Sequence, residues 1–394
     1  MLVQKYKDML SGKSVIRQLS EFATARGQEI GYENVFDYSL GNPSVPVPRE
    51  FTDRMIHMLA TKEPLELHGY SPSLGITSVR EAIAENLEKR FGLPYRKEHI
   101  FMASGAAGAL AHAFRLVTEP GDEILTFAPF FPEYHPYVDL TGAVLKVVPP
   151  NLENFQINFE AFEEMLTEKV KAVLINTPNN PSGVVYSTPT LQRLADILRE
   201  KSQEYGHIIY LISDEPYREI VFEGVDSPCV SYFYDNTIMC YSFSKSLSLP
   251  GERIGYLVIP DEVADSEKLN AAANVATRIL GFVNAPTLQQ KVVEKCLNEK
   301  TDLSFYDRNR EDLYNGLKEC GFECIKPQGA FYLFVKSPVP NEKEFCEAAK
   351  KYNILIVPGS SFACPGYVRL AYCVSHETIV NSLPKFKELA KEYF

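Results

Sequence analysis

With 394 residues, of which 45% are hydrophobic and 23% charged, the chain can bury a large core and is not disordered. A formal charge of -11 argues against a nucleic-acid partner, and no apolar run is long enough to cross a membrane. The cysteines are scattered, which predicts reduced thiols, and neither they nor the histidines have the spacing of metal ligands, so we expect no metal. The start of the chain lacks the apolar core of a signal peptide, and we therefore expect a cytoplasmic protein.

The first part of the chain, residues 1–36, predicts a helical arm of mixed charge. Gly12-Lys13-Ser14 resembles the end of a P-loop, but Lys7 stands where that motif needs a glycine, so the match fails. An extended segment rich in turns and prolines follows over residues 38–48 and suits a domain boundary.

Residues 48–285 predict an α/β domain. Helical spacing covers 51–60 and 76–90, and short apolar strands then alternate with helices. The expected strands are 100–103, 123–128, 144–148, 172–176, 208–213, 237–243 and 254–259. Apolar strands separated by helices favour a mostly parallel sheet covered on both faces, which is a three-layer αβα arrangement.

From residue 286 the pattern changes. We expect a long helix over 286–320, shorter strands at 322–325, 331–335 and 368–373, and helices at 342–352 and 377–391. This mixture predicts a smaller α+β domain formed by residues 286–394, with residues 1–47 packed against it.

Polar residues follow the ends of several predicted strands. Ser104, Asn180, Asp214 and Ser242 all lie at or just after a strand's end. Because ligands of such sheets bind at the carboxyl ends of the strands, we expect these residues to converge on one crevice. The glycine-containing turn 104–108, which leads into a helix, also favours an anion there.

The stretch 242–256 combines hydroxyls, glycines and one guanidinium around one amine. Ser242, Ser244 and Arg253 can bind phosphate oxygens. Lys245 is the only amine, and a neighbouring cation would make it lose its proton more easily. A serine-rich loop with a solvated lysine is the alternative, which fits less well because apolar runs flank the loop on both sides.

These residues together match the groups of pyridoxal 5′-phosphate. The expected partners are Lys245 for the aldehyde, Asp214 for the protonated ring nitrogen, Asn180 and Tyr217 for the ring hydroxyl, Gly105, Ala106, Ser242, Ser244 and Arg253 for the phosphate, and an aromatic of Phe130-Phe131 for the ring face.

The order and spacing of five motifs carry a resemblance. They are N-N-P-S-G at 179–183, S-D-E-P-Y at 213–217, S-F-S-K at 242–245, P-G-E-R-I-G-Y at 250–256 and R-L-A-Y at 369–372. Over nearly its whole length the chain resembles the class I/II pyridoxal-phosphate-dependent aminotransferases, of the aspartate aminotransferase superfamily and fold type I.

The resemblance implies a role for each matching residue. Lys245 would be the Schiff-base lysine, and Asp214 and Tyr217 would assist it. The implied cofactor site comprises Gly105, Ala106, Ala107, Phe131, Asn180, Asp214, Tyr217, Ser242, Ser244, Lys245, Arg253 and Tyr70. Arg369 would bind the substrate α-carboxylate, with Gly41 and Asn180 nearby. Tyr70 would reach the phosphate of a neighbouring subunit, which implies a homodimer.

Each placement has a structural alternative. Asp214 could cap a helix, Asn180 could serve turn geometry, and Arg369 could form a structural salt bridge, but a buried charge is costly without a partner. Tyr217 and Phe131 could be ordinary core aromatics, and Tyr70 could simply pack.

The implied reaction is ping-pong transfer of an amino group from an L-amino acid to a 2-oxo acid. Some aspartate aminotransferases of this subgroup carry a lysine that meets the distal carboxylate of the substrate, and this chain has Ala107 at that position, which puts aspartate as the substrate in doubt. Arg278 could supply the missing positive charge, but we favour its interpretation as a solvated arginine. The aromatic loop 130–134 suits an apolar or aromatic substrate.

The alternative functions are a carbon–sulfur β-lyase on the same fold, a ligand-binding regulator, for which the DNA-binding module is absent, and a nucleotide-binding α/β protein.

Overall fold

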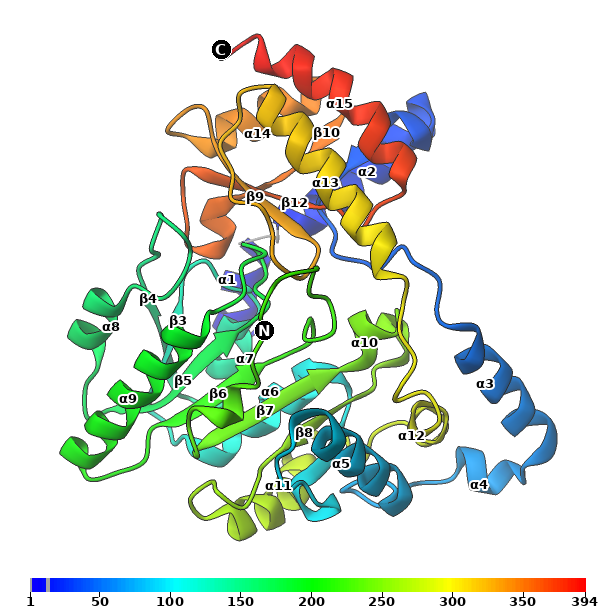
Figure 1. Cartoon of the computed structure of the whole chain (residues 1–394), viewed down its shortest axis with the longest axis vertical. Helices are drawn as coiled ribbons and strands as arrows, with labels where there is room; N and C mark the ends of the chain where they lie inside the picture. The colour runs from blue at the N-terminus through cyan, green and yellow to red at the C-terminus, as the bar shows by residue number, and fades with distance from the viewer. Residues whose placement is uncertain (1, 12–14) are drawn as a thin grey trace.

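The computed structural model describes residues 2–11 and 15–394 and is built around a seven-stranded sheet (Figure 1). The strands are, in spatial order, β2 (Ile100–Ala103), β8 (Gly255–Val258), β7 (Thr237–Ser242), β6 (Tyr210–Asp214), β5 (Val170–Asn176), β3 (Glu123–Phe127) and β4 (Val144–Val148). β8 runs antiparallel to both of its neighbours, β2 and β7, and all other neighbouring pairs are parallel. The mostly parallel sheet is therefore confirmed.

The described helices are α1 (Gln4–Ser11), α2 (Val15–Ile30), α3 (Arg49–Thr61), α4 (Pro64–His68), α5 (Thr77–Phe91), α6 (Gly105–Val117), α7 (Tyr134–Asp139), α8 (Phe159–Met165), α9 (Thr188–Tyr205), α10 (Phe243–Ser246), α11 (Ser266–Leu280), α12 (Thr287–Glu294), α13 (Leu303–Glu319), α14 (Glu342–Lys351) and α15 (His376–Ala390). Gly12-Lys13-Ser14, which failed the P-loop pattern, lie outside the described residues.

Both faces of the large sheet are covered because successive strand residues point to opposite sides and both sets are apolar. Leu174 packs in a cluster with α6, α7 and α11, whereas its neighbour Val173 packs in another with α8 and α9. A third cluster joins α5 and α12 to the β2–β8–β7 end. This is the three-layer αβα arrangement expected from the sequence.

A smaller α+β unit lies at the other end of the molecule (Figure 1). Its sheet has the antiparallel order β11 (Val357–Pro358), β12 (Tyr367–Ala371) and β9 (Tyr332–Lys336), and β1 (Phe36–Asp37) pairs in parallel with β10 (Ile354–Leu355). Helices α13, α14 and α15 cover this unit. Leu19 of α2 belongs to the same apolar cluster as Leu355 and Val357.

Two local expectations were wrong. The single helix expected over 286–320 is two helices, α12 and α13, because Asp302 caps a new helix by accepting a 2.9 Å hydrogen bond from the Ser304 amide. Val292 and Val293 of α12 pack with α5, on the large sheet. The strand expected at 322–325 is only an isolated bridge between Cys324 and Val335.

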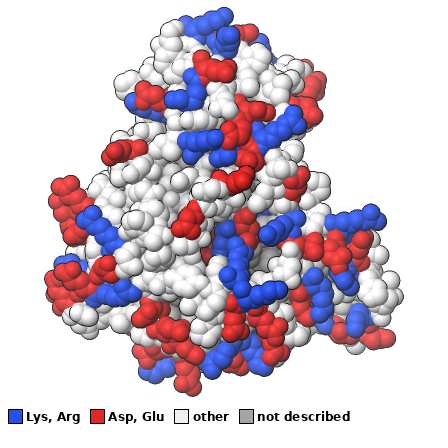
Figure 2. Space-filling view, in the orientation of Figure 1, with Lys and Arg blue, Asp and Glu red and all other residues white. Residues whose placement is uncertain are grey.

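The surface carries charges of both signs (Figure 2), and the cysteines, all of which lie in the described part of the chain, form no disulfide bonds. On the face shown in Figure 2, acidic and basic side chains are interspersed. Six cysteines are buried, Cys320 and Cys324 are half-buried, and all eight are free thiols. Over residues 2–11 and 15–394, no helix combines the length and apolar character that a membrane span requires, and no three potential ligand side chains gather as a metal site.

Candidate active site

A cavity of about 380 Å³ opens at the carboxyl end of the large sheet, where the strand-end residues were expected to converge. Of the residues that the sequence singled out, those lining it are Gly41, Ala106, Ala107, Phe131, Asn180, Asp214, Tyr217, Ser242, Ser244, Lys245, Arg253 and Arg369. Gly105 and Ser104, the latter also expected at this crevice, do not line the cavity, although both lie next to Arg253. Tyr70 lies elsewhere, just after α4, and is 91% exposed.

Lys245 reaches the cavity from a single turn of helix that follows β7. Ser242, the last residue of β7, caps this turn because its hydroxyl accepts a 3.1 Å hydrogen bond from the Ser244 amide. The Lys245 Nζ donates a 2.6 Å hydrogen bond to the Gly41 carbonyl. Burial lowers the pKa of the Lys245 amine to about 8. A larger neutral fraction makes this amine a better nucleophile than an exposed lysine.

Asp214 ends β6 and is buried in the cavity wall. The Tyr134 hydroxyl donates a 2.6 Å hydrogen bond to Oδ2, while Oδ1 is buried without a partner. Burial raises the pKa of the Asp214 carboxyl to about 7. An unsatisfied carboxylate oxygen is costly, and the protonated nitrogen of a pyridine ring would satisfy it.

The anion-binding part of the cavity lies between the start of α6 and the turn of α10. The hydroxyls of Ser242 and Ser244 lie 2.7 Å apart. The Arg253 guanidinium donates to the Ser104 carbonyl at 3.3 Å. Gly105 has φ +75°, and a Cβ there would come within 2.7 Å of that guanidinium. The backbone amides of α6, two hydroxyls and one guanidinium together suit a phosphate group.

Arg369 enters the cavity from β12 of the smaller unit. Its Nη1 donates a 3.1 Å hydrogen bond to Asn180 Oδ1, another nitrogen donates to the Ser39 carbonyl, and Nε has no partner. The guanidinium lies 4.8 Å from the ring centres of both Tyr332 and Phe362. It is buried, and no described carboxylate pairs with it. A carboxylate ligand would compensate this charge.

Two aromatic residues that the sequence singled out also face the cavity. Tyr217 shares a 2.8 Å hydrogen bond with the hydroxyl of Tyr332. Phe131 lines the cavity and packs edge-on against Tyr134. The residues present therefore fit pyridoxal 5′-phosphate at each of its groups, the clearest sign being the unpartnered Asp214 oxygen.

Sequence reasoning missed several contributors. Tyr134 was noted only as part of an aromatic loop, and Tyr332 was absorbed into an apolar strand. Ser39 contributes its carbonyl, and backbone groups leave no signal in residue type. Tyr137 and Asn176 also line the cavity. Asn176 at the end of β5 was the one detectable signal, because a polar residue closing an apolar strand is the same pattern that identified Asp214.

The comparisons with known proteins fit this geometry. The aminotransferase class I and II family matches residues 33–384. An aspartate aminotransferase of Thermotoga maritima is 31% identical over 95% of this chain and 98% of its own length. An aromatic-amino-acid aminotransferase of Thermococcus litoralis is 30% identical over 96% of each chain.

Solved structures show the same similarity. An aminotransferase structure from Eubacterium rectale superposes with a TM-score of 0.97 at 46% identity, covering 100% of this chain and 99% of that one. The Thermotoga maritima aspartate aminotransferase structure gives a TM-score of 0.87 at 28% identity, covering 99% and 100%.

The fold and the family match define a pyridoxal-phosphate-dependent enzyme of fold type I. The chain belongs to the class I and II aminotransferase family. It is a transaminase that moves an amino group from an amino acid to a 2-oxo acid.

Proposed function

We propose that Lys245, Asp214 and Tyr217 carry the catalysis of this aminotransferase and that the cavity around them holds cofactor and substrate. One observation carries the proposal. A half-buried amine, a carboxylate oxygen without a partner and a buried guanidinium without a described carboxylate all face one cavity of about 380 Å³.

When bound, pyridoxal 5′-phosphate supplies an aldehyde for covalent attachment and a ring that accepts the electron pair released at the substrate α-carbon. Lys245 Nζ would attach to it. Asp214 Oδ1 would hold a proton at the ring nitrogen, and Asn180 and Tyr217 would contact the ring hydroxyl. Phe131 would stack on the ring. Ser242, Ser244 and Arg253, with the backbone of Gly105, Ala106 and Ala107, would bind the phosphate.

Lys245 would also move the proton in the reaction. Burial lowers the pKa of its amine to about 8, so a substantial fraction of the free amine would be neutral at pH 8 and could act as a base. Nζ would accept the proton released from the substrate α-carbon and hold it close to the reacting atoms. Water would supply the carbonyl oxygen of the 2-oxo acid that is released, and the amino group would pass to a second 2-oxo acid with release of one water.

Arg369 would bind the α-carboxylate through its guanidinium, which Asn180 and the Ser39 carbonyl hold in place. The Gly41 backbone lies beside it: a Cβ at Gly41 would meet the Tyr332 hydroxyl at 2.0 Å. A side chain at Gly41 would therefore displace Tyr332 and narrow the substrate site.

For the substrate we propose an amino donor with an uncharged apolar or aromatic side chain. The cations that line the cavity among the described residues are Lys245, Arg253 and Arg369, and each already has a role. Glu133 adds a negative charge to the lining, and Arg278 lies exposed on α11, outside it. A second carboxylate on the substrate would therefore lack a partner within this chain.

The test is a panel of amino acids assayed with 2-oxoglutarate and with pyruvate as acceptors. We expect kcat/KM for phenylalanine, tyrosine or leucine to exceed that for aspartate by about tenfold or more. A clear preference for aspartate would refute the substrate proposal. Cystathionine without an acceptor tests the β-lyase alternative, because release of pyruvate and ammonia at rates comparable with transamination would favour the lyase.

We also propose a homodimer, supported by the exposed apolar side chains of Leu65, Tyr70 and Ile56 on the α3–α4 segment, which extends from the side of the molecule (Figure 1). The free thiols support the reducing cytoplasm as the compartment of this protein.

We also propose that the chain divides into a large domain, 48–285, and a small domain, 1–47 with 286–394. The packing of α12 favours a boundary after this helix.

A further inference from the structure

In two pairs of consecutive residues, Asp214–Glu215 and Lys245–Ser246, the first residue lines the active-site cavity and the second does not. Glu215 and Ser246 are buried on the opposite side, where Ser246 lines a separate cavity of about 370 Å³. Side-chain contacts that connect Glu215 with Ser246 therefore also fix the backbone of Asp214 relative to the backbone of Lys245.

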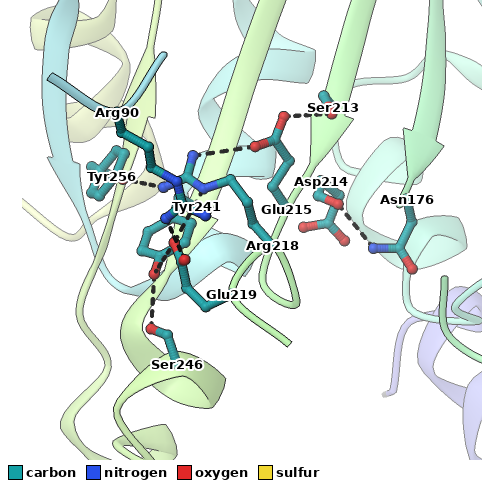
Figure 3. Close-up of polar contacts among 10 residues, drawn as sticks. All are labelled: Arg90, Asn176, Ser213, Asp214, Glu215, Arg218, Glu219, Tyr241, Ser246 and Tyr256. Carbon is teal, nitrogen blue, oxygen red and sulfur yellow. Dashed lines mark hydrogen bonds and ion pairs between the residues drawn. The ribbon is translucent and has the colours of Figure 1, made fainter. Parts of the chain in front are cut away.

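Arg218 forms the first half of this link (Figure 3). Its Nη1 donates a 3.2 Å hydrogen bond to Glu215 Oε2, and its Nε donates a 3.3 Å hydrogen bond to Glu219 Oε1. Its third contact is a 2.8 Å hydrogen bond from Nη2 to the Tyr256 hydroxyl. Because Arg218 and Glu215 are both buried, the two bonds from Arg218 to the carboxylates are poorly screened and hold the 214–219 segment in place.

Tyr241 forms the second half. Its hydroxyl donates a 2.8 Å hydrogen bond to Ser246 Oγ, and the same oxygen lies 3.4 Å from Glu219 Oε1 (Figure 3). The Arg218 guanidinium lies 4.2 Å from the centre of the Tyr241 ring. The path thus runs from Glu215 through Arg218, Glu219 and Tyr241 to Ser246, without touching the catalytic cavity.

We propose that Tyr241 is a positioning residue, whose hydroxyl fixes the α10 turn against the 214–219 segment and so sets the placement of Lys245 relative to Asp214. The proposal rests on the roles proposed above for those two residues. Tyr241 belongs to β7, where it faces away from the cavity while the next residue, Ser242, faces into it. It therefore acts through its neighbours and touches neither cofactor nor substrate.

The chain offers a matched control. Tyr256 is as buried as Tyr241, packs against it at 4.8 Å between ring centres, and contacts Arg218 through its hydroxyl, but it has no contact with Ser246. Removing Arg218 itself would leave the buried Glu215 carboxylate without an ion-pair partner and risk unfolding. Single hydroxyl deletions avoid this problem.

The experiment compares holoenzymes of the wild type, Tyr241→Phe, Tyr256→Phe, Ser246→Ala and the double variant Tyr241→Phe/Ser246→Ala. The readouts are kcat, KM, the visible circular dichroism of the bound cofactor, which reports how it is held, and the thermal midpoint. Lys245→Ala serves as a separate arm, in which loss of the covalently bound chromophore is expected if Lys245 is the attachment site.

We expect Tyr241→Phe and Ser246→Ala each to lower kcat by about tenfold with KM changed less than about twofold, and to change the visible dichroism. The double variant should be no worse than either single variant, because both break the same contact. Tyr256→Phe should change kcat by less than about twofold even at an equal loss of thermal stability.

Equal effects of Tyr241→Phe and Tyr256→Phe, or unchanged dichroism in Tyr241→Phe, would overturn the positioning role. A chromophore that survives covalently in Lys245→Ala would instead overturn the proposed function. The two failures are therefore distinguishable.

Discussion

The Tyr134 hydroxyl donates a 2.6 Å hydrogen bond to one carboxylate oxygen of Asp214 and leaves the other oxygen buried without a partner. The pair thus fixes the carboxyl in orientation and keeps one oxygen available. A buried acid in this state has its pKa raised to about 7 by burial, so it suits a ligand that brings a positive charge.

Replacing Asp214 with alanine should hurt proton transfer far more than cofactor retention. The phosphate and the covalent link would still hold the cofactor, whereas the ring nitrogen would lose the partner that keeps it protonated. We expect the rate of the first half-reaction to fall by about 10³-fold, in stopped-flow measurements, with bound cofactor largely retained. Equal losses of both would count against the electron-sink role of Asp214.

Asp214 should also make the stability of the apoprotein depend on pH. Its pKa is about 7 in the folded chain and about 3.9 in an unfolded one, so between these values only the folded state holds the proton. The free energy of unfolding should therefore decrease as pH rises through this window, by up to about 1.4 kcal/mol per pH unit from this group.

Urea unfolding of the apoprotein at pH 5 and pH 7 measures this effect. Asp214→Asn should lose this part of the pH dependence, whereas Asp235→Asn, at an exposed site, should keep it. An unchanged pH dependence in Asp214→Asn would show that Asp214 does not carry the proton.

Replacing Arg369 with lysine should raise KM for both the amino acid and the 2-oxo acid. Lysine cannot reproduce the two contacts to Asn180 and the Ser39 carbonyl together with a bidentate grip on a carboxylate. We expect kcat/KM to fall by about 100-fold, or roughly 3 kcal/mol, while the visible spectrum of the bound cofactor stays the same. A changed spectrum with normal KM would place Arg369 in the cofactor site instead.

Mixing two inactive variants tests the shared site. If Tyr70 completes the phosphate site of the neighbouring subunit, a dimer of one Lys245→Ala and one Tyr70→Phe protomer contains one intact site. Refolding an equimolar mixture should then recover about a quarter of wild-type activity, as random pairing predicts. Recovery no greater than the sum of the separate variants would mean that Tyr70 acts within its own subunit or not at all.

The sequence was most informative where local pattern and chemistry coincide. Between residues 100 and 258, apolar strands alternate with helices along the chain, and this alternation predicted the large sheet because few sheet topologies are compatible with it. Asp214 and Ser242 were placed at the cavity because each closes such a strand, and ligands of these sheets bind at that edge.

The remaining features depend on contacts between distant segments. The Tyr332 hydroxyl meets Tyr217 across 115 positions of sequence, and the Tyr134 hydroxyl meets Asp214 across 80. In a sequence either tyrosine reads as an ordinary core aromatic. The break between α12 and α13 was missed for a related reason, since the tertiary packing of α12 on α5 competes with a continuous helical pattern.

The most direct test is borohydride reduction of the holoenzyme, followed by peptide mapping of the label. We predict that the reduced cofactor is found on the peptide containing Lys245, and that Lys245→Ala takes up no label and has no measurable transamination. Label on another lysine, or normal turnover in Lys245→Ala, would contradict it.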